Sequence, residues 1–249
     1  MRFSQALTPA TFVQRVNRFL AIVKMHARLV EVHVPNSGRL EELFLPGRRV
    51  WLEAARQPGR RTLFTLRLVE LGPKPPLTHE EGATESGPIL VSVDARLPAP
   101  LFAEAWTQGR LSPFTGYTAL QAEARLGDSR IDFRLQDEAR VCWVETKSVT
   151  LVDEADQPGT ALFPDAPTVR GARHLRELMG AAQQGQRAAV VFVVQRSDAR
   201  AFAPHPSADP AFVAALREAT RAGVEVHAYR CFVDLSAITI WDSLPVRIE

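Results

Sequence analysis

The stretch from Asp128 to Thr150 contains two runs in which apolar and polar residues alternate. The first run is Ser129–Leu135 and the second is Val141–Thr150, and the segment 137–140 between them is polar apart from one alanine. Alternation with period two places successive side chains on opposite faces of a strand, and two such runs around a short polar loop are typical of a β-hairpin. The sequence therefore predicts a hairpin here.

The register of this hairpin decides which polar side chains meet. If Gln136 faces Val141, counting back along both strands places Asp132 opposite Glu145, with Lys147 on the same face. Opposed residues have β-carbons about 4.5–5.5 Å apart, so the two carboxylates repel each other unless a cation lies between them. Hard divalent cations such as Mg²⁺ prefer oxygen ligands, so the register predicts a site for such an ion.

Composition limits the class of protein. A chain of 249 residues with 46% apolar and 23% charged residues is long enough for one large or two ordinary globular domains. No apolar run approaches the roughly 20 residues that span a bilayer, and Arg15, Arg18 and Lys24 interrupt the N-terminal region, which argues against a signal peptide. Cys142 and Cys231 fall in predicted strands, as buried thiols of a cytoplasmic protein would. The net charge is only +2, so any nucleic-acid surface must be a local patch.

The first third of the chain is predicted to be all-β. Short apolar-rich runs at 18–24, 28–34, 48–54 and 62–70 are separated by turns, which favours a small barrel or sandwich. Gly72–Pro88 is polar and rich in Pro and Gly, as linkers and long exposed loops are. These features predict a boundary near residue 85, with domains 1–84 and 85–249.

The second domain is predicted to alternate helices and strands. Thr168 and Asp209 are expected N-caps, Pro210 suits a first helical position, and Gly223 suits a helix end. The apolar run Ala188–Val194 is typical of a strand buried on both faces. Helix, three strands, helix, strand, helix, strand is an α/β order. The full set of predictions is strand 89–93, helix 100–109, strand 117–126, the hairpin, irregular chain 158–167, helix 168–184, strand 188–194, helix 210–222, strand 224–231 and further strands at 231–234 and 237–241.

Five segments carry a resemblance that covers nearly the whole chain. They read VHVPNSGRLEEL (32–43), SRIDF (129–133), ETKSVTL (145–151), FPDAPTVRGARHLREL (163–178) and VEVHAYRC (224–231). In this order they resemble the sugar fermentation stimulation protein family. Asp132 followed by Glu145-Thr146-Lys147 is similar to the D…(D/E)-x-K signature of the restriction-endonuclease-like PD-(D/E)XK phosphodiesterases. The resemblance implies an N-terminal OB-fold and a C-terminal nuclease-like α/β domain.

The resemblance also implies roles for particular residues. Asp132, Glu145 and the carbonyl of Thr146 are expected to hold Mg²⁺ or Mn²⁺, Lys147 to orient water or stabilise the phosphate, and Glu123 to add a carboxylate. Glu104 is a weaker candidate for a further carboxylate of the site. Gln195 directly follows the buried strand, and this position brings it within reach of the site. The family more usually has Val where this chain has Thr146, whose side chain is expected to point away from the site. The family also carries Asn residues before the first helix, where this chain has Ser92, Asp94 and Ala99.

The alternative for the hairpin is a plain charged outer face, with cross-strand pairs such as Glu145 with Arg130. Basic residues elsewhere either contact nucleic acid or simply face water, as clusters of charge commonly do. Asn36 is expected to form a turn first and to contact a ligand second, and His174 is more often a packing residue than a base. The candidate nucleic-acid contacts are Arg15, Arg18, Asn36, Arg39, Arg61, Arg130, Arg170, Arg173 and His174.

Three functions remain open from the sequence. The first is a Mg²⁺- or Mn²⁺-dependent nuclease in which the barrel grips DNA or RNA. The second is a DNA-binding regulator of sugar (maltose) metabolism without turnover, the role that the family's name implies. The third and weakest is a sugar sensor, which is disfavoured because the only aromatic residues near the predicted barrel turns, Phe44, Trp51 and Phe64, lie in runs typical of a core. The resemblance allows a homodimer, and no helix-turn-helix or zinc-finger pattern is visible.

Overall fold

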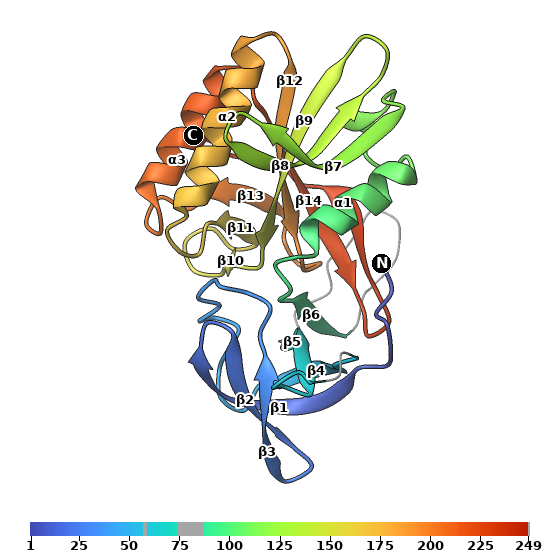
Figure 1. Cartoon of the computed structure of the whole chain (residues 1–249). Coiled ribbons are helices and arrows are strands. Elements are labelled where there is room, and N and C mark those ends of the chain that lie inside the picture. Colours follow the sequence, from blue (N-terminus) through green and yellow to red (C-terminus); the bar gives the residue numbers. More distant parts are fainter. Residues whose placement is uncertain (57–58, 74–86, 249) are drawn as a thin grey trace.

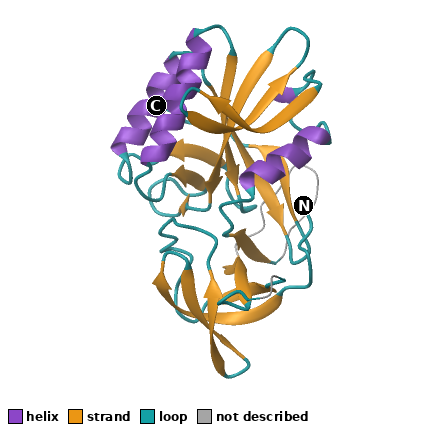
Figure 2. Cartoon of the chain, viewed as in Figure 1, coloured by secondary structure: helices purple, strands orange, loops and turns teal. Residues whose placement is uncertain are grey.

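The computed structural model describes residues 1–56, 59–73 and 87–248. The chain forms two domains stacked along one axis (Figure 1). Within the described residues, helices occur only in the second domain, while the first is built from strands and loops (Figure 2). No described helix is long and apolar enough to cross a membrane.

The first domain is a barrel. Its strands follow the order β3-β2-β1-β4-β5, and a parallel bridge between His33 and Thr65 joins β3 to β5 and closes it. Alternate side chains such as Phe12, Val32 and Leu66 fill the interior. A closed five-stranded arrangement of this kind is the OB-fold that the resemblance implies. The strands are β1 (Thr8–Asn17), β2 (Leu20–Met25), β3 (Arg28–His33), β4 (Arg49–Ala54) and β5 (Phe64–Pro73).

The first barrel strand, β1, is absent from the prediction. Its core-facing positions Ala10 and Phe12 do alternate, but Pro9 lies within the strand and Pro normally argues against a strand. The predicted strand at 18–24 begins too early because Asn17 accepts a hydrogen bond from the backbone N–H of Phe19 and turns the chain there.

The barrel sheet continues beyond the predicted boundary at residue 85. Strand β6 (Pro88–Ser92) pairs antiparallel with β5 and so extends the sheet of the first domain. At its end, the Ser92 N–H donates to the carbonyl of Gln195 in the second domain. Most of the predicted linker, residues 74–86, lies outside the described residues, as do residues 57–58 of a predicted turn.

A mixed sheet forms the centre of the second domain. Its order is β15-β14-β12-β9-β8-β7, in which β12 runs parallel to both β9 and β14 and the outer pairs are antiparallel. This is the restriction-endonuclease-like core implied by the resemblance. The strands are β7 (Ala119–Leu126), β8 (Ser129–Gln136), β9 (Val141–Val149), β12 (Arg187–Val194), β14 (Glu225–Val233) and β15 (Ile238–Ser243).

Helices cover both faces of this sheet (Figure 1). Helix α1 (Pro98–Thr107) packs on one face, and α2 (Val169–Gln183) and α3 (Pro210–Arg221) pack on the other. Both predicted N-caps are confirmed, because Thr168 Oγ1 accepts from Gly171 N and Asp209 Oδ1 accepts from Phe212 N. Strand β12 is buried on both faces, as its continuous apolar run predicts.

The hairpin forms in the predicted register. Gln136 pairs with Val141 and Phe133 with Val144, so the next pair inward brings Asp132 beside Glu145. Ile131, Phe133 and Leu135 are buried, as their alternation predicts. Cys142 and Cys231 are buried free thiols.

The prediction of irregular chain over 158–167 is wrong for residues 160–163 and holds for the rest of the segment. Strand β11 (Thr160–Phe163) pairs antiparallel with β10 (Val152–Asp153) and parallel with β13 (Ala201–Pro204) in a small separate sheet. These strands are four residues or fewer, which is too short for a periodic pattern to develop. A short 3₁₀-helix, η1 (Ser112–Phe114), follows α1.

Two neighbouring strands are joined by an ion pair that should respond to acid. Arg187 of β12 donates to both oxygens of Glu225 of β14, at 2.5 and 2.8 Å, and His227 Nε2 lies 2.8 Å from Glu225 Oε2. Burial raises the pKa of Glu225, but the hydrogen bonds of Arg187 and His227 outweigh it and lower the pKa from 4.5 to about 2. Because the folded-state pKa is depressed, this stabilisation is present above pH 4.5 and is lost as the pH falls toward about 2.

We therefore expect Glu225→Gln to lower the urea midpoint of unfolding at about pH 6, and the gap to the wild type to close as the pH approaches about 2. The measurement is urea unfolding of both proteins across that range. A gap that stays constant with pH would show that the pair does not couple folding to protonation.

Candidate functional site

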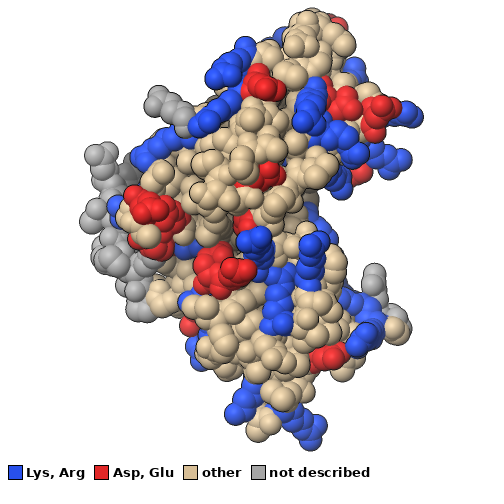
Figure 3. Space-filling model, turned by 90° about the vertical axis from the view of Figure 1, so that its left-hand side faces the viewer, with Lys and Arg blue, Asp and Glu red and all other residues tan. Residues whose placement is uncertain are grey.

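A wide cleft of about 1100 Å³ separates the two domains. The barrel contributes the loop around residues 36–41, and the second domain contributes β9 and the segment from Leu162 to Arg170. Figure 3 shows the molecule hollowed between the domains, with Lys and Arg side chains on both sides of the hollow. The two walls approach each other closely at Gly38 of the barrel and Asp165 of the second domain. A β-carbon at Gly38 would clash with the Asp165 carboxylate, so glycine leaves room for it there.

The two predicted acids lie side by side in this cleft. Thr146 donates to Asp132 Oδ2 twice, from its backbone N at 2.8 Å and from its Oγ1 at 2.5 Å. The Asp132 N–H in turn donates to Glu145 Oε2 at 3.3 Å. The expectation that the Thr146 side chain points away from the site is therefore wrong, because its hydroxyl fixes the orientation of Asp132.

Glu145 is held by two further side chains. Lys147 Nζ and His174 Nδ1 each lie 2.5 Å from Glu145 Oε1. Arg170 Nε donates to His174 Nε2, so the proton of a neutral His174 lies on Nδ1 and points at Glu145. Lys147 thus shares the face of the two acids, as predicted, and Glu145 pairs with Lys147 and His174 instead of Arg130.

The two carboxyl groups have opposite pKa shifts. Burial and the negative charge of Glu145 raise the pKa of Asp132. Burial also acts to raise the pKa of Glu145, but the hydrogen bond of His174 and the charge of Lys147 outweigh it and lower that pKa. Asp132 is therefore the carboxyl group whose charged form is disfavoured by its surroundings, and Glu145 is the one whose charged form is stabilised.

This donor set fits a hard divalent cation. Asp132 Oδ1 accepts no hydrogen bond among those of the described residues, and the negative charge of Glu145 is close enough to raise the pKa of Asp132. Within the described part of the chain, no three His, Cys, Asp or Glu side chains are close enough to hold a metal ion by themselves. A cation at this place would therefore need backbone or water oxygens in addition to the two carboxylates.

The other predicted acids lie in different places. Glu123 lines the cleft, and its β7 position faces Asp132 in the strand register, but its side chain is exposed and its backbone has φ of 52°. Glu104 is outside the cleft, because it binds the ammonium group of Met1 at 2.6 Å. Gln195 is fully buried and binds Ser92, Ser148 and the Asp94 carbonyl, so it joins the domains without entering the cleft.

The predicted nucleic-acid residues divide into two groups. Arg15, Arg18, Asn36, Arg39 and Arg170 line the cleft. The other group lies outside its lining and consists of Arg61, which pairs with Glu31, together with Arg130, Arg173 and His174. His174 is 1% exposed, so its prediction as a nucleic-acid contact is wrong; the amphipathic pattern placed it on the basic face, but it packs under Glu145.

Two cleft residues have their polar groups occupied by the protein itself. The guanidinium of Arg15 donates to the carbonyls of Arg18, Asn36, Gly38 and Arg39 and lies over the ring of Phe44. The Asn36 side chain accepts from Gly38 N and donates to the Val93 carbonyl. These two residues shape the barrel loop, from which the exposed side chain of Arg39 extends, while the exposed Arg18 lies in the turn between β1 and β2.

Sequence reasoning missed one cation of the cleft, Arg96. It lines the cleft from the segment that joins the domains, and it binds the buried carboxylate of Asp94. The only signal in the sequence is Asp94 itself, an acid in an otherwise apolar run just before a helix.

Comparisons with known proteins agree with this architecture. Residues 13–75 match the model of the SfsA N-terminal OB domain, and residues 96–237 match that of the sugar fermentation stimulation protein RE domain. A sugar fermentation stimulation protein homolog of Chloroflexus aurantiacus is 46% identical over 96% of this chain and 85% of its own length. The homolog of Moorella thermoacetica is 43% identical over 98% of this chain and 97% of its own.

A solved structure, that of Pyrococcus furiosus SfsA in complex with Ca²⁺, superposes with a TM-score of 0.83 at 31% identity, over 99% of this chain and 98% of that one. Both domains, their order and nearly the full length are therefore shared with these proteins. The chain belongs to the sugar fermentation stimulation protein family.

Proposed function

We propose that the protein is a metal-dependent phosphodiesterase that cleaves nucleic acid held in the cleft between its domains. The observation that carries this proposal is the pairing of Asp132 with Glu145, with Lys147 on the same face, in a cleft whose walls carry exposed arginines. A site that only bound phosphate would gain nothing from two carboxylates facing the ligand. The relative from Pyrococcus furiosus is in complex with Ca²⁺, which supports a divalent cation as the ligand.

Each residue has a definite part in this proposal. Asp132, Glu145 and the backbone carbonyl of Thr146 would hold Mg²⁺ or Mn²⁺, which supplies Lewis-acid activation of water and stabilises charge on the phosphoryl oxygens. Lys147 orients the attacking water or stabilises the scissile phosphate. Thr146 Oγ1 holds Asp132 in place, and His174 does the same for Glu145. Arg18, Arg39 and Arg170 contact phosphates along the strand.

The second candidate is a DNA-binding regulator of sugar metabolism that performs no chemistry. The names of the relatives favour it, since those proteins are called sugar fermentation stimulation protein homologs. Exposed arginines in the cleft would serve either function. The two carboxylates distinguish them, because a binder loses affinity from negative charge beside a phosphate.

A nuclease assay separates the two candidates. Plasmid DNA, single-stranded DNA and RNA are incubated with the wild type in Mg²⁺, Mn²⁺ or EDTA, and with the variants Asp132→Ala and Lys147→Ala. Lys24→Ala, an exposed lysine of β2, is the matched control. We expect the wild type to cleave at least one of these substrates, and we expect this cleavage to require metal. The activity should be lost in both site variants and retained in the control.

The contrary result is equally clear. If the wild type cuts none of the substrates with either metal, yet gel shifts show DNA binding that persists in both site variants, the enzyme proposal is wrong. The protein is then a binder whose acidic pair has no catalytic part.

A further inference from the structure

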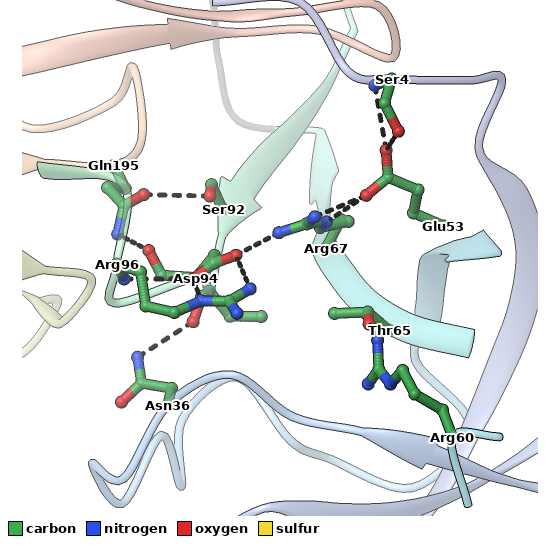
Figure 4. A network of polar contacts seen from close by, with 11 residues as sticks. Ser4, Asn36, Glu53, Arg60, Thr65, Arg67, Ser92, Asp94, Arg96 and Gln195 are labelled. Carbon is green, nitrogen blue, oxygen red and sulfur yellow. Dashed lines mark hydrogen bonds and ion pairs between the residues drawn. The ribbon is translucent and has the colours of Figure 1, made fainter. Parts of the chain in front are cut away.

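The segment that joins the two domains carries a buried network of charges. Asp94 is 1% exposed and lies between two guanidiniums, those of Arg67 and Arg96 (Figure 4). Arg67 also binds Glu53, with Nε 2.7 Å from Oε2, and Glu53 accepts from Ser4. The four side chains Glu53, Arg67, Asp94 and Arg96 carry two negative and two positive charges, so the network is neutral only with Arg96 included.

Arg96 is the outermost member of this network. Its Nε donates to Asp94 Oδ1 at 2.8 Å and its Nη2 to Asp94 Oδ2 at 2.6 Å, a two-point contact that fixes the plane of the guanidinium. Its side chain is nevertheless 63% exposed, and it lines the cleft. The hydrogen bond of the Arg96 backbone N to Asp94 Oδ1 adds a third contact between the two residues.

The backbone around Asp94 is held from both domains. Asn36 of the barrel loop donates to the Val93 carbonyl, and Ala95 N donates to the carbonyl of Pro35. From the second domain, Gln195 Nε2 donates to the Asp94 carbonyl at 3.1 Å (Figure 4). Arg96 therefore extends from a fixed point at the junction of the domains, unlike Arg18, which lies in the turn between β1 and β2, and Arg39, which lies in the barrel loop.

The contact with Asp94 leaves donors free. A guanidinium has five N–H groups, and the two-point contact uses one on Nε and one on Nη2. No hydrogen bond of the described residues involves Arg96 Nη1, so its two N–H groups and the second on Nη2 remain for a ligand. A planar fork of this kind matches the oxygens of a phosphate.

We propose that Arg96, oriented by Asp94, is a preset contact for a backbone phosphate of the nucleic-acid strand in the cleft that also contains the acidic pair. The inference rests on the proposed function and adds a residue and its orienting partner to it. A side chain ordered before binding loses less conformational entropy when the ligand arrives, so a fixed Arg96 gives more affinity than a free surface arginine.

Binding measurements test this role without cleavage. Fluorescence anisotropy with a labelled single-stranded oligonucleotide and the matching duplex, in Ca²⁺, compares the wild type with Arg96→Ala and Arg96→Lys. Arg61→Ala is the control, since Arg61 is 81% exposed and lies outside the cleft lining. Titrations at several salt concentrations give the slope of log K against log salt.

We expect Arg96→Ala to weaken binding about tenfold and to reduce the salt slope by about 0.7 for the single strand or 0.9 for the duplex. Arg96→Lys should restore the slope but little of the affinity, because an ammonium cannot contact Asp94 and a phosphate as a planar fork does. If Arg96→Ala and Arg61→Ala bind with equal affinity and equal salt slope, the inference about Arg96 is wrong. The proposed function is unaffected by that result as long as the wild type binds the probes. A wild type that binds neither probe overturns both.

Discussion

Replacing Asp132 by Asn is expected to make the metal-free protein more stable and, at the same time, to lower its cleavage rate by roughly 10³-fold. The gain in stability follows from the raised pKa of Asp132, caused by burial and by Glu145. A carboxyl whose folded-state pKa lies above its ordinary value destabilises the fold at neutral pH, and this cost ends when the charge is removed. The Asn oxygen can still accept both hydrogen bonds of Thr146, and the backbone N–H of residue 132 can still donate to Glu145.

Thermal unfolding with and without Ca²⁺, Mg²⁺ or Mn²⁺ measures the first effect, and the nuclease assay measures the second. The wild type should gain stability with metal, by about 2.7 kcal/mol at a hundredfold excess over the dissociation constant. Asp132→Asn should have a higher melting temperature than the wild type without metal, and adding metal should raise it little. Asp128→Asn, an exposed acid outside the cleft lining, is the control. If Asp132→Asn lowers the melting temperature of the metal-free protein, the two carboxylates do not repel each other as described.

The second large effect concerns an ion pair behind the cleft. Arg196 and Asp198 make a two-point contact at 2.6 and 2.7 Å, with both side chains 3% exposed, and Arg196 Nη1 donates to the Thr150 carbonyl. We expect Asp198→Ala to lower the free energy of unfolding by about 3–5 kcal/mol, because it leaves a buried guanidinium without its counter-charge. Thr150 follows β9 and lines the cleft, so this pair supports the strand that carries Glu145 and Lys147.

Urea unfolding of Asp198→Ala beside Glu31→Ala measures this difference. Glu31 belongs to an exposed pair with Arg61, 3.6 Å apart, and an exposed pair contributes about 0–1 kcal/mol. If the two variants lose comparable free energy of unfolding, burial of the Arg196–Asp198 pair does not increase its contribution to stability.

Local patterns in the sequence predict much of this fold. The hairpin register follows from alternation in β8 and β9, and the caps at Thr168 and Asp209 follow from side-chain chemistry. The small sheet containing β11 is different, because its pairing with β13 depends on residues about forty positions away. Short strands of that kind gain their stability from tertiary contacts, which no local pattern records.

The candidate site likewise contains residues that local sequence patterns identify and residues that only distant contacts bring into place. Asp132, Glu145 and Lys147 are brought together by one hairpin, so counting along it is enough to find them. Arg96 depends on contacts from two domains, and His174 reaches Glu145 from a helix that follows in sequence. The position of Thr146 Oγ1 on Asp132 departs from simple strand alternation, which would turn it to the other face.

The extension of the barrel sheet by β6 has a consequence for synthesis of the chain on the ribosome. Strands β1 to β5 can close as soon as they emerge, but the end of β6 is fixed by Gln195, which is made 103 residues after Ser92. At about 5–20 residues per second, that interval lasts roughly 5–20 s, during which β6 has no partner from the second domain. The first domain is thus completed only by the second, and a nascent chain halted before residue 195 would expose the unfinished junction to proteases and chaperones.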